Sequence, residues 1–425
     1  MSWDFETDPA FQVELDWIGR FVRERVEPLD HLLGSPWNIH DPEFVRLVRP
    51  LQAEVKARGL WACHLGPELG GAGYGQVKLA LMNEILGRSG FAPIVFGCQA
   101  PDSGNSEILA HYGTPEQKTR WLEPLLDNRI VSCFAMTEPQ GGADPSVFNT
   151  RAERDGDEWV ITGQKWFASN ARYAAVFLVV AVTDPTVSVH EGLSMLIVPA
   201  GTPGLTIVRN VGIGDEPEAT HAYLDFDHVR VPLDHLLGEP GQAFAVAQVR
   251  LGGGRVHHAM RTIGLAQKAL DAMCERALSR RTQGSRLADK QMVQERIADS
   301  WIELEQFRLL VMRTAWRIDK YQDHRRVRQD IAAVKAAMPK LLHDIAARAL
   351  HLHGSAGVSQ EMPFAGMVLR AFQMGLADGP TEVHKITVAK QLLRRYQASE
   401  AVFPDYHKPT AAAAAQALYG LDDAL

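Results

Sequence analysis

The chain has 425 residues, of which 46% are hydrophobic, and its formal net charge is −7 at pH 7. This length allows a large core divided over two or three domains. The acidic balance argues against non-specific attraction to nucleic acid or to an anionic membrane, because such binders normally carry a basic excess.

The cysteines and the first residues bear on location. The four cysteines are far apart and form no Cys-x-x-Cys pair, which favours neither a disulfide framework nor a zinc ribbon. The opening residues MSWDFETDPA resemble neither a secretion signal nor an Arg-rich presequence. No run approaches the roughly 20 apolar residues that span a bilayer. We therefore expect a soluble cytoplasmic protein with no membrane partner.

The hydrophobic period divides the chain into three. Residues 1–130 have apolar residues at three- and four-residue spacing and predict an all-helical domain. Within 131–243 the period is two, in short β-rich runs such as EWVITGQKWFAS, which predicts a β-domain. Within 244–425 the helical period returns in long segments that pack as a bundle. The expected class is α+β, mainly α, and the Ala-rich tail 409–425 receives no assignment.

Two kinds of site are not indicated. GPELGGAGYG lies between helical segments and lacks a Lys-Ser/Thr ending, so it supports neither a Walker loop nor a Rossmann fingerprint. His257 and His258 are adjacent, and His351 and His353 are two apart, so neither pair shares a helix face. We expect no metal site.

Three segments carry candidate chemistry: CFAMTEPQGGAD at 133–144, ITGQKWFASNA at 161–171, and the stretch from HLHGSAG to LADGPTEVHK at 351–385. In order and spacing they resemble the acyl-CoA dehydrogenases, and the resemblance covers roughly residues 40 to 400. It implies an N-terminal helical domain, a middle β-barrel domain, a C-terminal four-helix bundle, and FAD as the cofactor.

The first two segments would hold the flavin ring. The resemblance implies that Thr137 and nearby backbone groups hydrogen-bond the pyrimidine edge of the isoalloxazine, with Phe134 and Met136 beside it. An ordinary strand ending in a Pro-Gly turn is the alternative for this segment. Trp166 and Phe167 would supply flat apolar surface, and which of the two rings stacks on the flavin is open. The remaining implied contacts are Ser169 near flavin N5 and Ala143 near the substrate.

The rest of the cofactor would meet later segments. LSRRTQGSRLADKQ at 278–291 resembles the family segment whose arginines clamp a pyrophosphate, although by itself that stretch is better explained as a solvated basic turn. The third segment is expected to approach the FAD of a partner subunit. The cofactor contacts implied for these segments are Arg280, Thr282, Gln291, His351, Gly354, Ser355, Thr381 and Glu382.

Asp378 has two interpretations. It fits a helix N-cap, because a helix is expected to begin at Pro380 or Thr381. It also fits a partly desolvated base, and the resemblance implies this role, although most family members have Glu. Asp is one methylene shorter, so its carboxylate lies about 1.5 Å further back. Some members carry the base on the helix after the β-domain, but the corresponding residue here is Gly254.

Residues near this acid receive further implied roles. Gly379 would contact the substrate thioester, and Arg255 would either neighbour the same portion of the substrate or pair with an acid. Gly252, Gly253 and Gly254 are costly inside a helix, at about 1 kcal/mol each relative to Ala. They would make room either for the acyl chain or its α-substituent, or for close helix packing. His384 receives no firm role.

The implied reaction is FAD-dependent α,β-dehydrogenation of an acyl-CoA to the trans-2-enoyl-CoA, as in fatty acid β-oxidation. Asp378 would remove the α-proton, and hydride would pass to flavin N5. The segment ADGPTEVH is most similar to the subgroup of mammalian acyl-CoA dehydrogenase family members 10 and 11, which suggests long or branched acyl chains. The implied partners are an electron-transferring flavoprotein and further copies of the chain, as a homodimer or homotetramer.

Two other functions on the same fold stay open. A nitroalkane-oxidase-like flavoenzyme would use the Asp on a small carbon acid without CoA. A flavin-bearing DNA-associated stress protein would need a basic face, whereas the chain has 44 Lys and Arg against 51 Asp and Glu. We therefore expect no nucleic acid partner.

Overall fold

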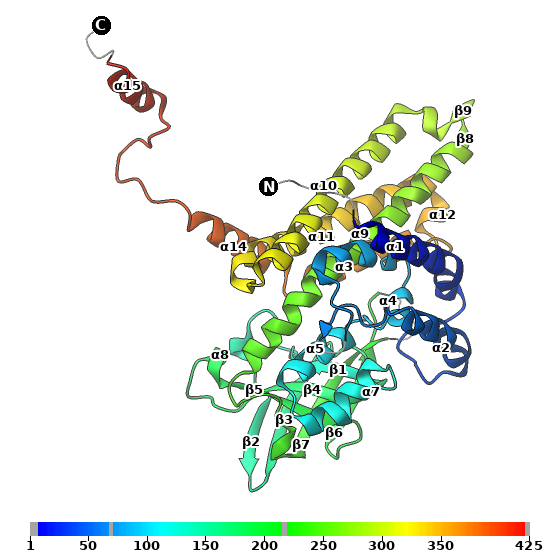
Figure 1. Cartoon of the computed structure of the whole chain (residues 1–425), viewed down its shortest axis with the longest axis vertical. Coiled ribbons are helices and arrows are strands. Elements are labelled where there is room, and N and C mark those ends of the chain that lie inside the picture. Colours follow the sequence, from blue (N-terminus) through cyan, green and yellow to red (C-terminus); the bar gives the residue numbers. More distant parts are fainter. Residues whose placement is uncertain (1–6, 68–70, 215–218, 421–425) are drawn as a thin grey trace.

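The computed structural model describes residues 7–67, 71–214 and 219–420. A helical part, a β-sheet and a bundle of long helices follow one another along the chain (Figure 1). The first part contains α1 (Pro9–Phe21), η1 (Val22–Val26), η2 (Glu27–His31), α2 (Pro42–Ala57), α3 (Gly75–Leu86), α4 (Ala92–Val95), α5 (Asp102–Tyr112), α6 (Pro115–Gln117), η4 (Lys118–Leu122) and α7 (Glu123–Leu126). Residues 68–70 of the GPELGGAGYG stretch lie outside the described residues.

The first helices begin where the sequence provides caps. Asp8 precedes Pro9, and its carboxylate accepts a hydrogen bond of 2.9 Å from the Phe11 amide. Asp41 precedes Pro42 and accepts one of 2.8 Å from the Glu43 amide. In both helices the Asp satisfies an otherwise unpaired N–H, and the Pro at the first position lacks one.

A curled sheet follows. Among the described residues its strands are β1 (Val131–Ala135), β2 (Arg151–Asp155), β3 (Glu158–Lys165), β4 (Ala174–Val182), β5 (Leu193–Pro199), β6 (Leu205–Val211) and β7 (His221–Pro232), with short η5 (Pro145–Val147), α8 (Val189–Gly192) and η6 (Leu233–His235) between them. The order is β1-β4-β2-β3-β7-β6, and β5 pairs with β4. β1 and β4 are parallel, whereas β3 and β7 are antiparallel. The candidate segments 133–144 and 161–171 begin within β1 and β3 and continue past the carboxyl ends of these strands.

The long helices form the bundle. They are α9 (Ala243–Ser279), α10 (Gln291–Tyr321), α11 (His324–His353), α13 (Phe364–Leu376) and α14 (Thr381–Leu393), with β8 (Arg281–Thr282), β9 (Ser285–Arg286), η7 (Leu287–Asp289) and α12 (Ser355–Val358) in their connections. Their core contains buried Met260, Phe307, Met338 and Phe364. The predicted α+β class and the helix, sheet, bundle order are confirmed. No described helix is both long and apolar enough to cross a membrane.

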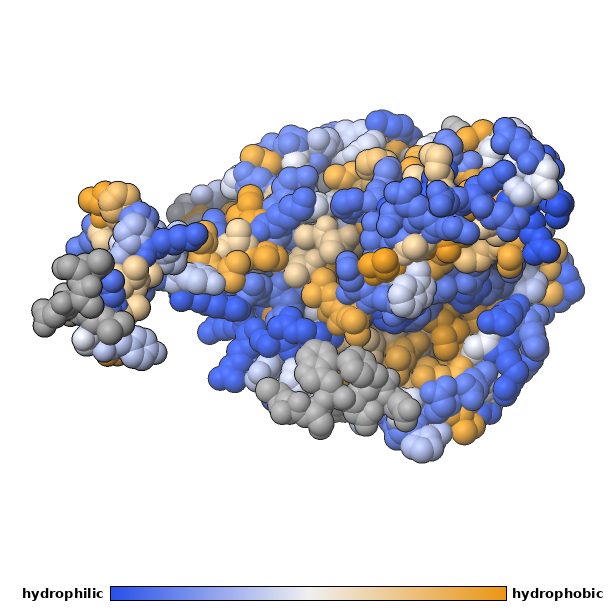
Figure 2. Space-filling view, turned by 90° about the horizontal axis from the view of Figure 1, so that it is seen from above, coloured by the Kyte–Doolittle hydropathy of each residue, from blue (hydrophilic) through white to orange (hydrophobic). Residues whose placement is uncertain are grey.

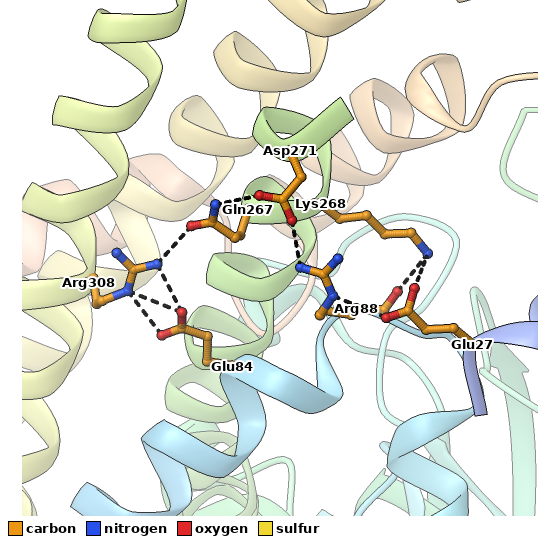
Figure 3. Close-up of polar contacts among 7 residues, drawn as sticks. All are labelled: Glu27, Glu84, Arg88, Gln267, Lys268, Asp271 and Arg308. Carbon is orange, nitrogen blue, oxygen red and sulfur yellow. Dashed lines mark hydrogen bonds and ion pairs between the residues drawn. The ribbon is translucent and has the colours of Figure 1, made fainter. Parts of the chain in front are cut away.

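A polar network joins the first helical part to the bundle (Figure 3). Arg88, just after α3, contacts Glu27 at 3.1 Å and Asp271 on α9 at 2.9 Å. Arg308 on α10 contacts Glu84 on α3 at 2.9 Å. Gln267 and Lys268 of α9 complete the network drawn there. These contacts fix α9 against α3, and α9 carries much of the site described below.

The C-terminal segment stands away from the body (Figures 1 and 2). It contains α15 (Lys408–Leu418), so the Ala-rich tail left unassigned from the sequence is helical in part. Its large apolar side chains are exposed, including Val402 at 91% and Tyr406 at 85%.

Candidate functional site

A buried ion pair ties the first two candidate segments together. Lys165 Nζ at the end of β3 lies 2.8 Å from Glu138 Oε1, and the two side chains are 0% and 2% exposed. The same ammonium donates to the Met136 carbonyl at 2.9 Å. The Trp166 amide donates to the Thr137 carbonyl at 2.9 Å. The segments 133–144 and 161–171, which are separate in sequence, therefore form one rigid edge.

Both members of this pair have shifted pKa values. Burial lowers the pKa of Lys165 to about 8, against the opposing effect of Glu138. Burial raises the pKa of Glu138, but the Lys165 charge and the Asn149 amide outweigh it, so the net shift is downward. The Asn149 and Thr150 amides donate to this carboxylate at 2.6 and 3.0 Å. Glu138 is thus ionised and fully hydrogen-bonded despite its burial.

The aromatic residues beyond this edge differ in exposure. Phe167 has φ 57° and is 38% exposed, and its ring stacks on His221 with centroids 4.2 Å apart. An aromatic residue in the left-handed region is unusual and costs about 1–2 kcal/mol. Trp166 instead packs edge-on against Tyr223 and lies under the Arg209 guanidinium. Phe167 therefore offers the freer flat surface of the two.

The other residues predicted for this edge lie near it. The Ser169 hydroxyl is 3.0 Å from His221 Nδ1. Thr137 packs against Gly142, where an added Cβ would lie 3.1 Å from the Thr137 methyl carbon. Ala143 is exposed in the same turn. An exposed flat ring, two hydroxyls and a glycine-lined turn at one sheet edge suit a flat polar-edged ring system such as a flavin.

Asp378 lies between the end of α13 and the start of α14, with φ 55°. The residue before α14 is Pro380, and no side chain caps this helix. The N-cap interpretation of Asp378 is therefore wrong. Its carboxylate, 16% exposed, faces α9: Oδ1 lies 3.9 Å from an Arg250 nitrogen and Oδ2 lies 3.7 Å from His258 Nε2.

The backbone carbonyl of Asp378 is held separately. Arg255 Nε donates to this oxygen at 2.9 Å. His384 Nε2 contacts the same oxygen at 3.2 Å from α14. Gly379, with φ 101°, lies against the His384 ring.

The glycines of α9 make room for carboxylates. A Cβ at Gly254 would lie 3.2 Å from Asp378 Oδ2, and one at Gly253 would lie 3.2 Å from Glu107 Oε2. Such distances are tighter than ordinary contacts, so the missing side chains allow two acids from α5 and the α13–α14 turn to approach this helix. The sequence offers two explanations for these glycines, room for an acyl chain or close packing of a neighbouring helix. The contacts seen here favour neither explanation over the other.

Sequence reasoning missed the polar residues beneath Asp378. The Arg250 guanidinium lies over the Phe134 ring at 4.0 Å, and its Nε donates to Asn105 at 2.8 Å. Asp102 on α5 accepts hydrogen bonds from the backbone N–H and hydroxyl of Ser132. Arg250 therefore links the first candidate segment to Asp378, although no motif in the sequence marks it.

Several titratable groups here have perturbed pKa values. Burial raises the pKa of Glu107 to about 7, against the lowering effect of Arg250. Burial also raises the pKa of Asp102 to about 6. Burial lowers the pKa of His258 to about 4 and that of His64 to about 3. The imidazole of His258, which faces the Asp378 carboxylate, is thus neutral near pH 7.

His257 and His258 point to different sides of α9, as expected. His258 faces Asp378, whereas His257 meets His64 edge-on with ring centroids 6.5 Å apart. Both ring nitrogens of His64 and Nε2 of His257 are buried without a hydrogen-bond partner. The described residues contain no cluster of three or more metal-binding side chains.

The remaining predicted residues lie outside the sheet edge, and Thr381 and Glu382 stand at the start of α14, just after Asp378. The hairpin β8–β9, with Arg280, Thr282 and Gln291 in or beside it, is at one end of the long helices and the sheet is near the other (Figure 1). These three side chains are exposed, as are His351, Gly354, Ser355 and Glu382. Thr381 donates to the Gly375 carbonyl at 3.3 Å. One copy of the chain therefore does not bring all the predicted cofactor contacts together.

Three family profiles match the chain. They are the N-terminal domain of acyl-CoA dehydrogenase over 15–129, the middle domain over 133–229 and the C-terminal domain over 241–393.

Similar proteins carry related names. The probable acyl-CoA dehydrogenase FadE2 of Mycobacterium tuberculosis is 38% identical, over 92% of this chain and 93% of that one. Acyl-CoA dehydrogenase family member 11 of Rattus norvegicus is 41% identical over 90% of this chain, which spans 50% of that protein's length.

Solved structures are similar too. A putative acyl-CoA dehydrogenase from Mycobacterium abscessus superimposes with a TM-score of 0.85 at 37% identity, covering 92% of this chain and 100% of that one. Butyryl-CoA dehydrogenase from Megasphaera elsdenii gives 0.78 at 26% identity, with the same coverage of both chains.

The Lys165–Glu138 pair predicts a large effect of removing one charge. Glu138→Gln leaves Lys165 buried without its counter-charge, so we expect the free energy of unfolding to fall by about 3–5 kcal/mol. Urea denaturation measures this. The matched control is Glu158→Gln, which breaks a half-exposed pair with Arg230 and should cost less than about 1 kcal/mol. Equal losses in both variants would contradict the structural role.

Glu107 predicts a pH effect on stability. Its pKa is about 7 in the folded chain and near 4.5 otherwise, so its ionisation makes stability fall as pH rises from about 4.5 to about 7, by up to about 3 kcal/mol. Glu107→Gln should lose this part of the pH dependence and gain stability relative to the parent at pH 8 more than at pH 4.5. Thermal unfolding at both pH values measures it. The exposed control Glu123→Gln should shift both values equally, and a matching result for Glu107→Gln would refute the prediction.

Proposed function

The chain belongs to the acyl-CoA dehydrogenase family, and from this premise we propose that it oxidises an acyl-CoA thioester to the trans-2-enoyl-CoA with Asp378 as the base. The observation that carries the proposal is the carboxylate of Asp378, which is largely buried and faces α9 instead of capping α14. The enzyme is an FAD-dependent oxidoreductase.

The residues present fit FAD. Phe167, Ser169 and Thr137 at the sheet edge would hold the ring system, with Phe167 as the stacking residue because Trp166 is engaged elsewhere. Bound FAD supplies the acceptor for the electron pair that leaves the β-carbon of the substrate. The proposed pyrophosphate and adenosine contacts are Arg280, Thr282 and Gln291 at the β8–β9 end of the long helices, His351, Gly354 and Ser355 at the α11–α12 junction, and Thr381 and Glu382 at the start of α14.

Asp378 would take the α-proton of the thioester. Its packing against α9 leaves the carboxylate 16% exposed and keeps most water from that side. Arg250 at 3.9 Å places a positive charge beside it, and neutral His258 lies on its other oxygen. Both flanking groups restrict the directions in which the carboxylate can rotate. We propose Arg255, Gly379 and Ala143 as the substrate contacts.

The partner assignments are part of the proposal. Because the hairpin β8–β9 lies far from the sheet edge on one chain, a second copy is needed to complete the cofactor site, as a homodimer or homotetramer. An electron-transferring flavoprotein is the proposed electron acceptor. Four further points stay predictions from the sequence. They are the long or branched acyl chain, the place in β-oxidation, the cytoplasmic location and the domain boundaries at 130 and 243.

Asp378→Asn tests the proposal. The variant should fold and keep its flavin, while the rate of anaerobic flavin bleaching by the best substrate of an acyl-CoA panel falls 10²- to 10⁴-fold, because the amide cannot accept the proton. Asp227→Asn, at an exposed acid, is the control and should bleach normally. Bleaching of Asp378→Asn at the parent rate would contradict the assignment of this residue as the base.

The two alternative functions have their own tests. Turnover of nitroethane with none on acyl-CoA would favour the nitroalkane-oxidase alternative, and salt-sensitive DNA retention would favour the stress protein.

Gly254→Ala separates activity from stability. The new Cβ would lie 3.2 Å from Asp378 Oδ2 and push the carboxylate aside, so the bleaching rate should fall at least tenfold. Stability should not fall, because Ala is favoured over Gly inside a helix by about 1 kcal/mol. Gly366→Ala on α13 is the matched control, since nothing lies within 4 Å of its Cβ. Unchanged bleaching in Gly254→Ala would show that the carboxylate tolerates displacement.

A further inference from the structure

We propose that His384 is a positioning residue for Asp378: its Nε2–H holds the Asp378 carbonyl, and this contact, shared with Arg255, directs the carboxylate toward α9. The inference rests on the proposed function. It concerns a histidine in the first turn of α14 that makes no described contact with the carboxylate itself.

The backbone at Asp378 requires a restraint. Asp378 has φ 55° and Gly379 has φ 101°, so two successive residues lie in the left-handed region. This conformation costs a residue with a Cβ about 1–2 kcal/mol. Such a conformation persists only where surrounding contacts hold it. α13 ends at Leu376 and fixes the chain on the amino side, so the carbonyl contacts must fix the other side.

Two donors from different helices supply that restraint. Arg255 Nε on α9 and His384 Nε2 on α14 meet the same carbonyl oxygen at 2.9 and 3.2 Å. A carbonyl oxygen has two lone pairs, so both acceptor positions are used. Because the carbonyl can only accept, Nε2 of His384 must carry the hydrogen. The two donors fix the peptide between Asp378 and Gly379 from both sides.

The His384 ring is itself held tightly. It is 5% exposed, and a Cβ at Gly379 would lie 3.0 Å from its Nε2. Burial and the neighbouring charge of Arg255 lower the pKa of His384 to about 4, so the ring is neutral near pH 7 and still donates from Nε2. Only glycine fits at position 379 with the ring in this place.

The short acid makes this restraint important for the rate. Asp has one methylene fewer than Glu, so the direction of the carboxylate depends on the backbone of Asp378 with little side-chain freedom to correct it. A misplacement of about 1 Å at a reacting group costs roughly 10²-fold in rate. Loss of the His384 contact should therefore slow proton removal more than it weakens substrate binding.

The test measures proton removal alone. A 3-thia-acyl-CoA of the best chain length has sulfur in place of the β-carbon, so its α-protons can exchange but the molecule cannot be dehydrogenated. Exchange of these protons with D₂O, followed by NMR on the FAD-loaded enzyme, reports on the base. We expect His384→Ala to slow exchange 10- to 100-fold with the Kd of the analogue within threefold, and His384→Gln, which keeps an N–H donor, to recover most of the rate.

The control is His235→Ala. His235 is also buried and its Nδ1 contacts a backbone carbonyl, that of Ile197, at 2.8 Å, but it lies in η6 beyond the end of β7. Since this histidine lies in η6 and holds a carbonyl of β5, its loss should lower stability and leave the exchange rate normal. If His384→Ala does not retain FAD, His384→Leu fills the same space without a donor and replaces it in the comparison with His384→Gln.

The outcomes are distinct. Exchange by His384→Ala at the parent rate, or by His384→Gln as slowly as His384→Ala, would overturn this inference while leaving the proposed function intact. Failure of the parent enzyme to exchange the α-protons, together with no flavin bleaching by any acyl-CoA, would instead refute the proposed function.

Discussion

The buried contact between Lys165 and Glu138 is the interaction on which the site depends. Ionised side chains rarely occur at such low exposure, because their desolvation costs several kcal/mol each unless they are paired and hydrogen-bonded. Here the carboxylate also receives two backbone amides, and the ammonium reaches a backbone carbonyl. The polar groups of the segment 133–144 and those at the end of β3 thus satisfy one another. Phe167 lies just after the end of β3 and is held there in a backbone conformation that it would not adopt alone.

Asp378 is controlled through two separate sets of contacts. Its carboxylate lies against α9, between a charged Arg250 and a neutral His258, while its carbonyl is occupied by Arg255 and His384. Because α9 supplies three of these four side chains, the network that fixes α9 against the first helical part also determines where the acid lies (Figure 3). Folding of the distant helices and orientation of the reacting group are therefore linked by one element.

The sequence was sufficient for the architecture and for the parts of the site that have local signals. The change of hydrophobic period marks the sheet, and the acid of LADGP stands out because it follows an apolar helix and precedes a turn. Its two interpretations could not be separated until the structure showed Pro380 at the cap position. Arg250 and Glu107 have no such signal, since their roles arise from tertiary contacts across α5 and α9. His384 could not be assigned for the same reason.

The approach of Asp378 to Gly254 has an evolutionary consequence. The resemblance implies that an acid can stand on the long helix at the position that is glycine here, and the structure shows the two positions converging on one point, with 3.2 Å between an added Cβ and the carboxylate oxygen. A lineage could therefore transfer the base from one helix to the other by a reciprocal pair of substitutions while the substrate stayed in place. Acids at both positions would crowd two negative charges together, so an acid at one position requires a small residue at the other.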